Sequence, residues 1–231
     1  MKKFCAVLLV FGIILYLGFL AFNISRNVEN NSEKNKQEEL LKEEINKIYN
    51  LNYNIEEVDM TIKTTSEYGK IETIIKKYYS ELYSYQKEID SLAFYNTVVN
   101  TLSFESLDSA DLDSSKKQIN NKYERSLEKI NKIIELLDEE YILNLGSDIS
   151  KEYTSLYKTL AIPTNILEIK ENWENKRETI KETYSLAIKA LNILDNNKNL
   201  WHVENNKLYF HDEKLLNEYN SIISLLKLKN K

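Results

Sequence analysis

The sequence contains very few of the residues that turn a chain sharply or carry reactive groups. Its 231 residues include four glycines, one proline, one cysteine and two histidines. So few turn formers, in a chain rich in Leu, Ile, Lys and Glu, favour long helices over a sheet protein. The single cysteine, Cys5, lies inside an apolar run, which excludes a disulfide framework and a thiolate metal site.

The motifs of common enzyme classes are also missing. The sequence has no H-E-x-x-H zinc motif and no Glu-x-x-His pair of the kind found in di-iron bundles. It has no P-loop, no dinucleotide fingerprint and no G-x-S-x-G nucleophile motif. We therefore predict that the chain is not an enzyme and has no catalytic, cofactor-binding or metal-binding residues. A catalytic group assembled from distant residues is the alternative.

Beyond its N-terminal segment the chain is acidic. The net charge is −5, and Lys2, Lys3 and Arg26 are the only charged residues among the first 26. Residues 27–231 therefore hold 28 basic and 36 acidic side chains, a net charge of −8. Nucleic-acid-binding domains usually present a basic face, so we predict no nucleic-acid partner.

Residues 1–26 contain the longest apolar run. From Phe4 to Phe22, 19 residues carry no charge, and as a helix they would span ~28 Å, about one hydrocarbon core. A cleavable signal peptide would end in small residues at alternate positions, whereas this run ends in the letters LAFN. We predict an uncleaved, single-pass membrane anchor. A cleaved signal is the alternative.

The charges that flank this run bear on its orientation. Lys2 and Lys3 precede it and favour a cytoplasmic N-terminus, which would place the rest of the chain outside the cell membrane. Arg26, Lys34 and Lys36 follow it and oppose that orientation. We predict an extracytoplasmic C-terminal domain, and a membrane-tethered cytoplasmic adaptor is the alternative.

Residues 27–39 are predicted to be a polar linker or the frayed start of a helix, and residues 40–231 a helical bundle. Apolar side chains recur there at steps of three and four, as in a helix seam. The most regular seam consists of Ile71, Ile75, Tyr78, Leu82, Tyr85, Ile89 and Leu92. Helices are expected over residues 41–62, 71–92, 119–141, 153–160, 166–194 and 212–226. The expected fold is all-α, a transmembrane helix followed by an elongated antiparallel bundle.

The Ser- and Asp-rich residues 103–115 are predicted to be a loop. Three aspartates there suggest a calcium loop, but Lys116 and Lys122 stand where an EF-hand needs Gly and Glu. We therefore expect a turn followed by an acidic helix start, which suits the helix dipole.

The stretch NLWHVENNKLYFHDEKLL, residues 199–216, differs from the rest. A turn at Asn205-Asn206 makes Glu204 oppose Lys207 and sorts the flanking side chains onto two faces. The apolar face would hold Trp201, Val203, Leu208 and Phe210, and the polar face His202, Glu204, Lys207 and Tyr209. We predict a β-hairpin at about residues 200–210. An isolated hairpin is only marginally stable, so its apolar face should rest on the bundle.

These features lead us to expect a non-catalytic, membrane-anchored protein of interaction or scaffold type in the cell envelope. A small-ligand-binding bundle with a pocket between its helices is the alternative. The predicted partners are the membrane and a protein of unknown identity. Trp and Tyr side chains favour interfaces, although core and rim packing is the commoner explanation for them. The candidate interaction surface comprises Trp201, His202, Tyr209, Tyr79 and Tyr83.

Overall fold

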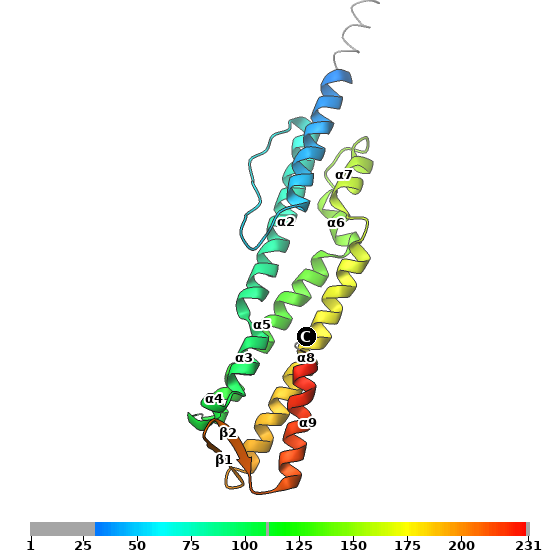
Figure 1. Ribbon diagram of the computed structural model, residues 1–231. Coiled ribbons are helices and arrows are strands. Elements are labelled where there is room, and N and C mark those ends of the chain that lie inside the picture. The colour runs from blue at the N-terminus through cyan, green and yellow to red at the C-terminus, as the bar shows by residue number, and fades with distance from the viewer. Residues whose placement is uncertain (1–30, 110, 230–231) are drawn as a thin grey trace, which may run out of the picture.

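The computed structural model describes residues 31–109 and 111–229, so the predicted anchor over residues 1–26 lies outside the described part. The described chain is mostly helical (Figure 1). After a helix over residues 31–49, the elements are α2 (Ser66–Leu92), α3 (Phe94–Thr101), α4 (Phe104–Ser109), α5 (Leu112–Leu136), α6 (Glu139–Leu145), α7 (Thr154–Ala161), α8 (Ile166–Asn196), β1 (Trp201–Glu204), β2 (Lys207–Phe210) and α9 (Glu213–Lys229). None of the helices among these residues is long and apolar enough to cross a membrane.

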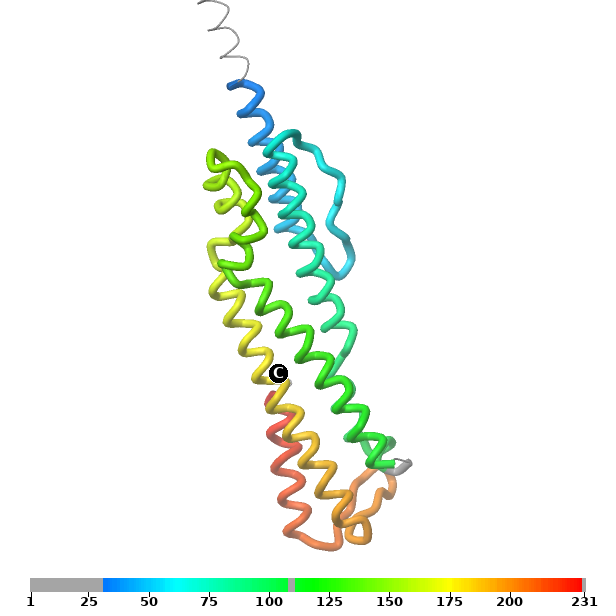
Figure 2. The backbone as a smooth tube through the Cα atoms, turned by 180° about the vertical axis from the view of Figure 1, so that it is seen from behind, coloured from blue at the N-terminus to red at the C-terminus, as the bar shows by residue number. Residues whose placement is uncertain are grey.

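The helices form an elongated antiparallel bundle, as predicted. α5 packs against both α2 and α8, and α9 returns along α8 (Figures 1 and 2). The helix over residues 31–49 lies beside α2 at one end, where α6 and α7 also pack. The hairpin, α4 and the start of α9 lie at the opposite end, here called the hairpin end.

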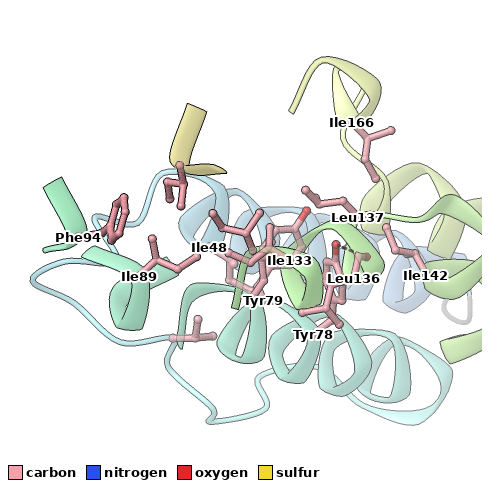
Figure 3. Packing of buried hydrophobic residues seen from close by; sticks show 14 of the residues in the cluster. Ile48, Tyr78, Tyr79, Ile89, Phe94, Ile133, Leu136, Leu137, Ile142 and Ile166 are labelled. Atoms are coloured by element: carbon pink, nitrogen blue, oxygen red, sulfur yellow. Dashed lines mark hydrogen bonds between the residues drawn. The ribbon is translucent and has the colours of Figure 1, made fainter. Parts of the chain in front are cut away.

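The predicted seam of α2 forms the core between the long helices. Most of its side chains are buried, including Ile71 and Ile75, and Tyr85 is partly buried against the same cluster. The Tyr78 hydroxyl donates a hydrogen bond to the carbonyl oxygen of Leu136 at 3.1 Å, across to α5 (Figure 3). The regular apolar stripe of α2 therefore marks the face of the helix that is buried, as its spacing predicts.

The first helical run ends earlier than its spacing predicted. Residues 31–49 are helical, including most of the segment expected to be a polar linker or the start of a helix, but residues 50–65 form an irregular loop. Ile55, which kept the apolar rhythm, is 80 % exposed. The loop leaves the helical path because its backbone is bound by two side chains of α2, Glu72 and Lys76.

Two further boundaries differ from the expectation. Residues 103–115 were expected to be a loop, yet α4 occupies six of them. The helix expected over residues 119–141 is interrupted after Leu136, because the Asp138 carboxylate accepts hydrogen bonds from the backbone N–H groups of Glu140 and Tyr141 and begins α6. An aspartate that caps a new helix competes with continuation of the old one.

The hairpin is confirmed with the predicted pairing. Trp201 faces Phe210, and Glu204 faces Lys207 at the turn. Asn205 and Asn206 have φ values of 49° and 58°, the left-handed conformation that a two-residue turn of this twist requires. The apolar face is partly buried against the bundle and the polar face is exposed.

Candidate functional site

The hairpin is tied to the bundle by its two outermost aromatic residues. The indole Nε1 of Trp201 donates a hydrogen bond to the carbonyl oxygen of Leu194, near the end of α8, at 2.7 Å. The ring of Phe210 lies 5.5 Å from that of Tyr219 on α9, centroid to centroid. These contacts hold β2 beside α9 and make the hairpin one wall of the hairpin end.

A kink between α2 and α3 forms the opposite wall. Ala93 has a φ of 47°, so α2 stops and α3 starts in a new direction. α3 anchors itself through Phe94 and Val98, which are buried. After Ser103, α4 begins with Phe104, whose side chain is 44 % exposed. The chain thereby lines the space opposite α9 with apolar side chains from two short helices.

A cavity of about 680 Å³ lies between these walls. Its volume falls within the ~300–1,000 Å³ that is usual for small-molecule sites. α3, α4, α8, β2 and α9 all contribute, so the cavity forms only when segments more than 100 residues apart pack together. The apolar part of the described lining comprises Val98, Val99, Leu102, Phe104, Leu208, Phe210, Leu216, Tyr219, Ile223 and Leu226.

A few polar groups lie among these apolar side chains. Thr183 of α8 is 2 % exposed, and its hydroxyl makes no hydrogen bond within the described residues. Lys207 and Lys227 also line the cavity, and the ammonium group of neither has an ion-pair or hydrogen-bond partner in the described part of the chain. Glu105 lies on the α4 side and interacts with another group of the chain. Burial raises the pKa of Tyr219 to about 12, so this phenol stays neutral.

The structure places the three candidate residues of the hairpin on two different faces. Trp201 lies on the inner face, where it packs against the core. His202 and Tyr209 lie on the outer face, with their rings 5.4 Å apart, and the ring of His211 stacks 5.2 Å from His202. The three stacked rings form an exposed aromatic surface, but they are not among the residues that line the cavity.

The two candidate tyrosines of α2 lie far from the hairpin, among the core residues of the other half of the bundle. Tyr79 is 4 % exposed and its ring packs against those of Tyr49 and Tyr78, so it does not contribute to a surface (Figure 3). Tyr83 is partly buried, and its hydroxyl donates to the carbonyl oxygen of Ile48 at 3.0 Å. Burial raises the pKa of both phenols, that of Tyr83 to about 12. These rings therefore pack in the core, as the core-packing explanation for the tyrosines expects.

A cluster of charged side chains lies inside the bundle, at the end opposite the hairpin. Lys76 is 1 % exposed, and its Nζ lies 2.7 Å from Glu72 and 3.1 Å from Glu44. Burial opposes ionisation of Glu72, but hydrogen bonds from Lys76, Thr64 and the loop backbone outweigh it and hold the pKa of this carboxyl below its usual value. Every charge in the cluster has a partner, so the cluster stabilises the 50–65 loop rather than offering a reactive group.

Within residues 31–109 and 111–229, no group of three His, Cys, Asp or Glu side chains is arranged to hold a metal ion. The cavity residues were not predicted from the sequence, because Phe104 fell in a segment assigned to a loop and Thr183 is a polar residue within the apolar stripe of α8, between Ile180 and Ala187. One indication of a buried surface in this region was present in the sequence, the apolar residues of α9, which include Tyr219, Ile222 and Leu226.

Comparison with known protein families, with curated proteins and with solved structures finds no match to this chain.

Proposed function

We propose that this protein acts by binding rather than by catalysis, as a helical bundle of interaction or scaffold type whose ligand site is the cavity at the hairpin end. The observation that carries this proposal is the cavity itself, about 680 Å³ in volume and lined mainly by apolar side chains. Apolar concave sites with a few polar groups are the usual form of a small-molecule site.

The partial exposure of the lining supports the same proposal. Val99 is 51 % exposed and Phe104 is 44 % exposed, and both line the cavity. An apolar ligand of this size would cover these side chains and gain ~25 cal/mol for each Å² of apolar surface removed from water. The ionic cluster of Lys76, by contrast, is sealed and fully paired, so it does not favour an enzymatic function.

We further propose that the bundle is held at the cell membrane by the apolar run between Phe4 and Phe22 and lies on its extracytoplasmic side. The support is the sequence alone, since Lys2 and Lys3 precede a run of 19 uncharged residues. Protease treatment of intact cells that express the full chain with a C-terminal tag tests this topology. Loss of the tag is expected, and a tag that survives until lysis would place the bundle in the cytoplasm.

Binding in the cavity is tested with dodecanol as an uncharged apolar probe. The full chain in a non-ionic detergent is melted with and without dodecanol, and the helical circular dichroism is followed. A ligand at ~100 times its Kd adds ~2.7 kcal/mol to the free energy of unfolding, which raises the Tm by ~5–10 °C for a chain of this size.

The matched variants are Ile223→Trp and Leu225→Trp, both on α9. Ile223 lines the cavity and its replacement by Trp fills it, whereas Leu225 is 49 % exposed and is not among the lining residues. We expect Ile223→Trp to lose the shift and Leu225→Trp to keep it. An equal shift in both variants would mean that dodecanol binds elsewhere, and the proposed site would be wrong.

A further inference from the structure

The two ends of the cavity differ in the side chains that line them. Lys229 of α9 forms an ion pair with Glu182 of α8, so these two residues lie at the same level of the two antiparallel helices. Thr183 follows Glu182, and Lys227 precedes Lys229 by two residues. Both line the cavity, so they lie at the same end of it. This end is called the Lys227 end below.

The opposite end is closed by the hairpin. Its turn contributes Asn206 and Lys207 to the lining, and below the turn the lining is apolar, with Leu208 and Phe210 of β2 and with Leu216 and Tyr219 of α9. The rings of Phe210 and Tyr219 lie 5.5 Å apart. From Leu216 to Lys227, α9 rises ~16 Å at 1.5 Å per residue. The lining of the cavity therefore extends along about three turns of α9.

Within residues 31–109 and 111–229, the Lys227 end has a positive charge without an ion-pair partner. Lys229 beside it is neutralised by Glu182, but Lys227 has no ion-pair partner among the described residues. Lys207, near the hairpin turn, is a second lysine of the lining without a partner in that part of the chain. The one acidic side chain of the described lining, Glu105, is engaged within the chain. A site on a domain of net charge −8 thus has a locally positive lining.

Thr183 adds a buried hydroxyl at the same end. It is 2 % exposed and does not meet the geometry of a hydrogen bond with any described residue. The phenol of Tyr95 lies near enough for the Thr183 hydroxyl to offset part of the rise that burial causes in the pKa of Tyr95. A buried hydroxyl without a well-formed hydrogen bond costs free energy, and this hydroxyl could donate a hydrogen bond to a ligand oxygen.

From this arrangement we infer that the ligand is a single-chain amphiphile with an anionic head group, a carboxylate or a phosphate. Its head would lie beside Lys227 and Thr183, and its apolar chain would run along α9 towards Phe210. This inference rests on the proposed function, because it names the chemical class of the ligand of the same cavity. Charge complementarity favours it over a neutral apolar ligand or a cationic amphiphile.

The experiment uses three photoactivatable probes with the same dodecyl chain and a diazirine at its end. Their heads are a carboxylate, a hydroxyl and a quaternary ammonium group. The full chain in non-ionic detergent is irradiated with each probe, and the labelled peptides are mapped by mass spectrometry. Labels on residues 1–30 are counted separately, because that apolar segment can also take up amphiphiles.

We expect the carboxylate probe to label peptides of α3, β2 and α9 about three to ten times more than the hydroxyl probe, the range for one partly exposed ion pair and its hydrogen bond. Lys227→Glu should abolish this preference, so that the carboxylate probe labels these peptides no more than the hydroxyl probe does. Lys214→Glu, the same charge change at an exposed position of α9 outside the described lining, should leave both unchanged.

The outcomes separate the two proposals. Equal labelling of the cavity by all three probes, or stronger labelling by the ammonium probe, would overturn the anionic head group and leave an apolar binding site in place. Absence of labelling in the cavity by every probe would overturn both. Unlabelled dodecanoate and dodecyl phosphate are then compared as competitors of the carboxylate probe. The stronger competitor assigns the head group as a carboxylate or a phosphate, and either result supports the inference.

Discussion

The ammonium of Lys76 lies 2.7 Å from the carboxylate of Glu72, one helical turn before it, and both side chains are almost completely buried. Two segments outside α2 complete this ion pair. Glu44 of the N-terminal helix lies 3.1 Å from the ammonium, and the carbonyl oxygen of Thr61 accepts a hydrogen bond from it at 2.6 Å. One buried lysine therefore joins a long helix, its neighbour and the loop between them.

Replacing Lys76 by Met should destabilise the bundle strongly. The substitution would leave Glu72 and Glu44 buried without the cation between them, a loss of about 3–5 kcal/mol in the free energy of unfolding. Urea denaturation of the full chain in non-ionic detergent measures this difference. The control is Lys132→Met, which removes an exposed i,i+3 pair with Glu135 and should cost at most ~1 kcal/mol. Similar losses in the two variants would contradict a structural role for the buried cluster.

Acid should weaken the same cluster. The folded state holds the pKa of Glu72 below its ordinary value of 4.5, so this carboxyl binds fewer protons in the folded than in the unfolded chain. Its stabilising contribution is therefore present above about pH 4.5 and is lost as the pH falls through the lower folded pKa. We expect the free energy of unfolding to fall below about pH 4.5, and to fall less steeply in Glu72→Gln. A Glu72→Gln variant with the wild-type acid slope would assign the effect to other carboxyls.

Gly146 should not tolerate even a methyl group. A Cβ atom at this position would lie 2.2 Å from the Cε1 atom of Tyr157, whose side chain is 1 % exposed. The ring cannot move freely, because its hydroxyl donates a hydrogen bond to the carbonyl oxygen of Ile142 at 2.5 Å. We expect Gly146→Ala to lower the free energy of unfolding by about 1–3 kcal/mol, the usual cost of overpacking. Ser147→Ala, at the exposed next position, is the control and should change it little.

The hairpin turn should discriminate between residues that accept a positive φ and those that do not. Asn206 has a φ of 58°, which costs a β-branched residue about 1–2 kcal/mol. We expect Asn206→Val to destabilise the chain by that amount and Asn206→Gly to stabilise it slightly. Hydrogen exchange of the hairpin amides checks the effect locally, since faster exchange is expected in the Val variant. Equal protection in the Val and Gly variants would show that the turn conformation is different.

The hairpin could be predicted in full from the sequence because its information is local. Two asparagines that accept positive φ mark the turn, and the alternation from Trp201 to Phe210 then leaves a single pairing that keeps the apolar face together. The seam of α2 was equally readable, since an unbroken apolar stripe has one helical interpretation. Both signals need no knowledge of the rest of the chain.

The loop over residues 50–65 shows where such reasoning fails. Ile55 and Ile62 continue the spacing of a helix, yet both are exposed, at 80 % and 38 %. The free energy gained by binding the loop backbone to Glu72 and Lys76 competes with the helix, and those two residues come after the loop in the sequence. A periodic pattern contains no information about such long-range partners.

By itself the sequence determined that the described chain is helical, that α2 buries a defined stripe and that a hairpin precedes the last helix. Few turn residues, regular apolar spacing and an Asn-Asn turn are properties of neighbouring residues, and local backbone energetics act on them directly. Only the tertiary structure decided where α2 bends, which loop the buried lysine holds, and that Thr183 and Lys227 line one cavity with Phe210. These features depend on how helices distant in the chain pack side by side, and packing is set by the fit of whole surfaces rather than by any local pattern.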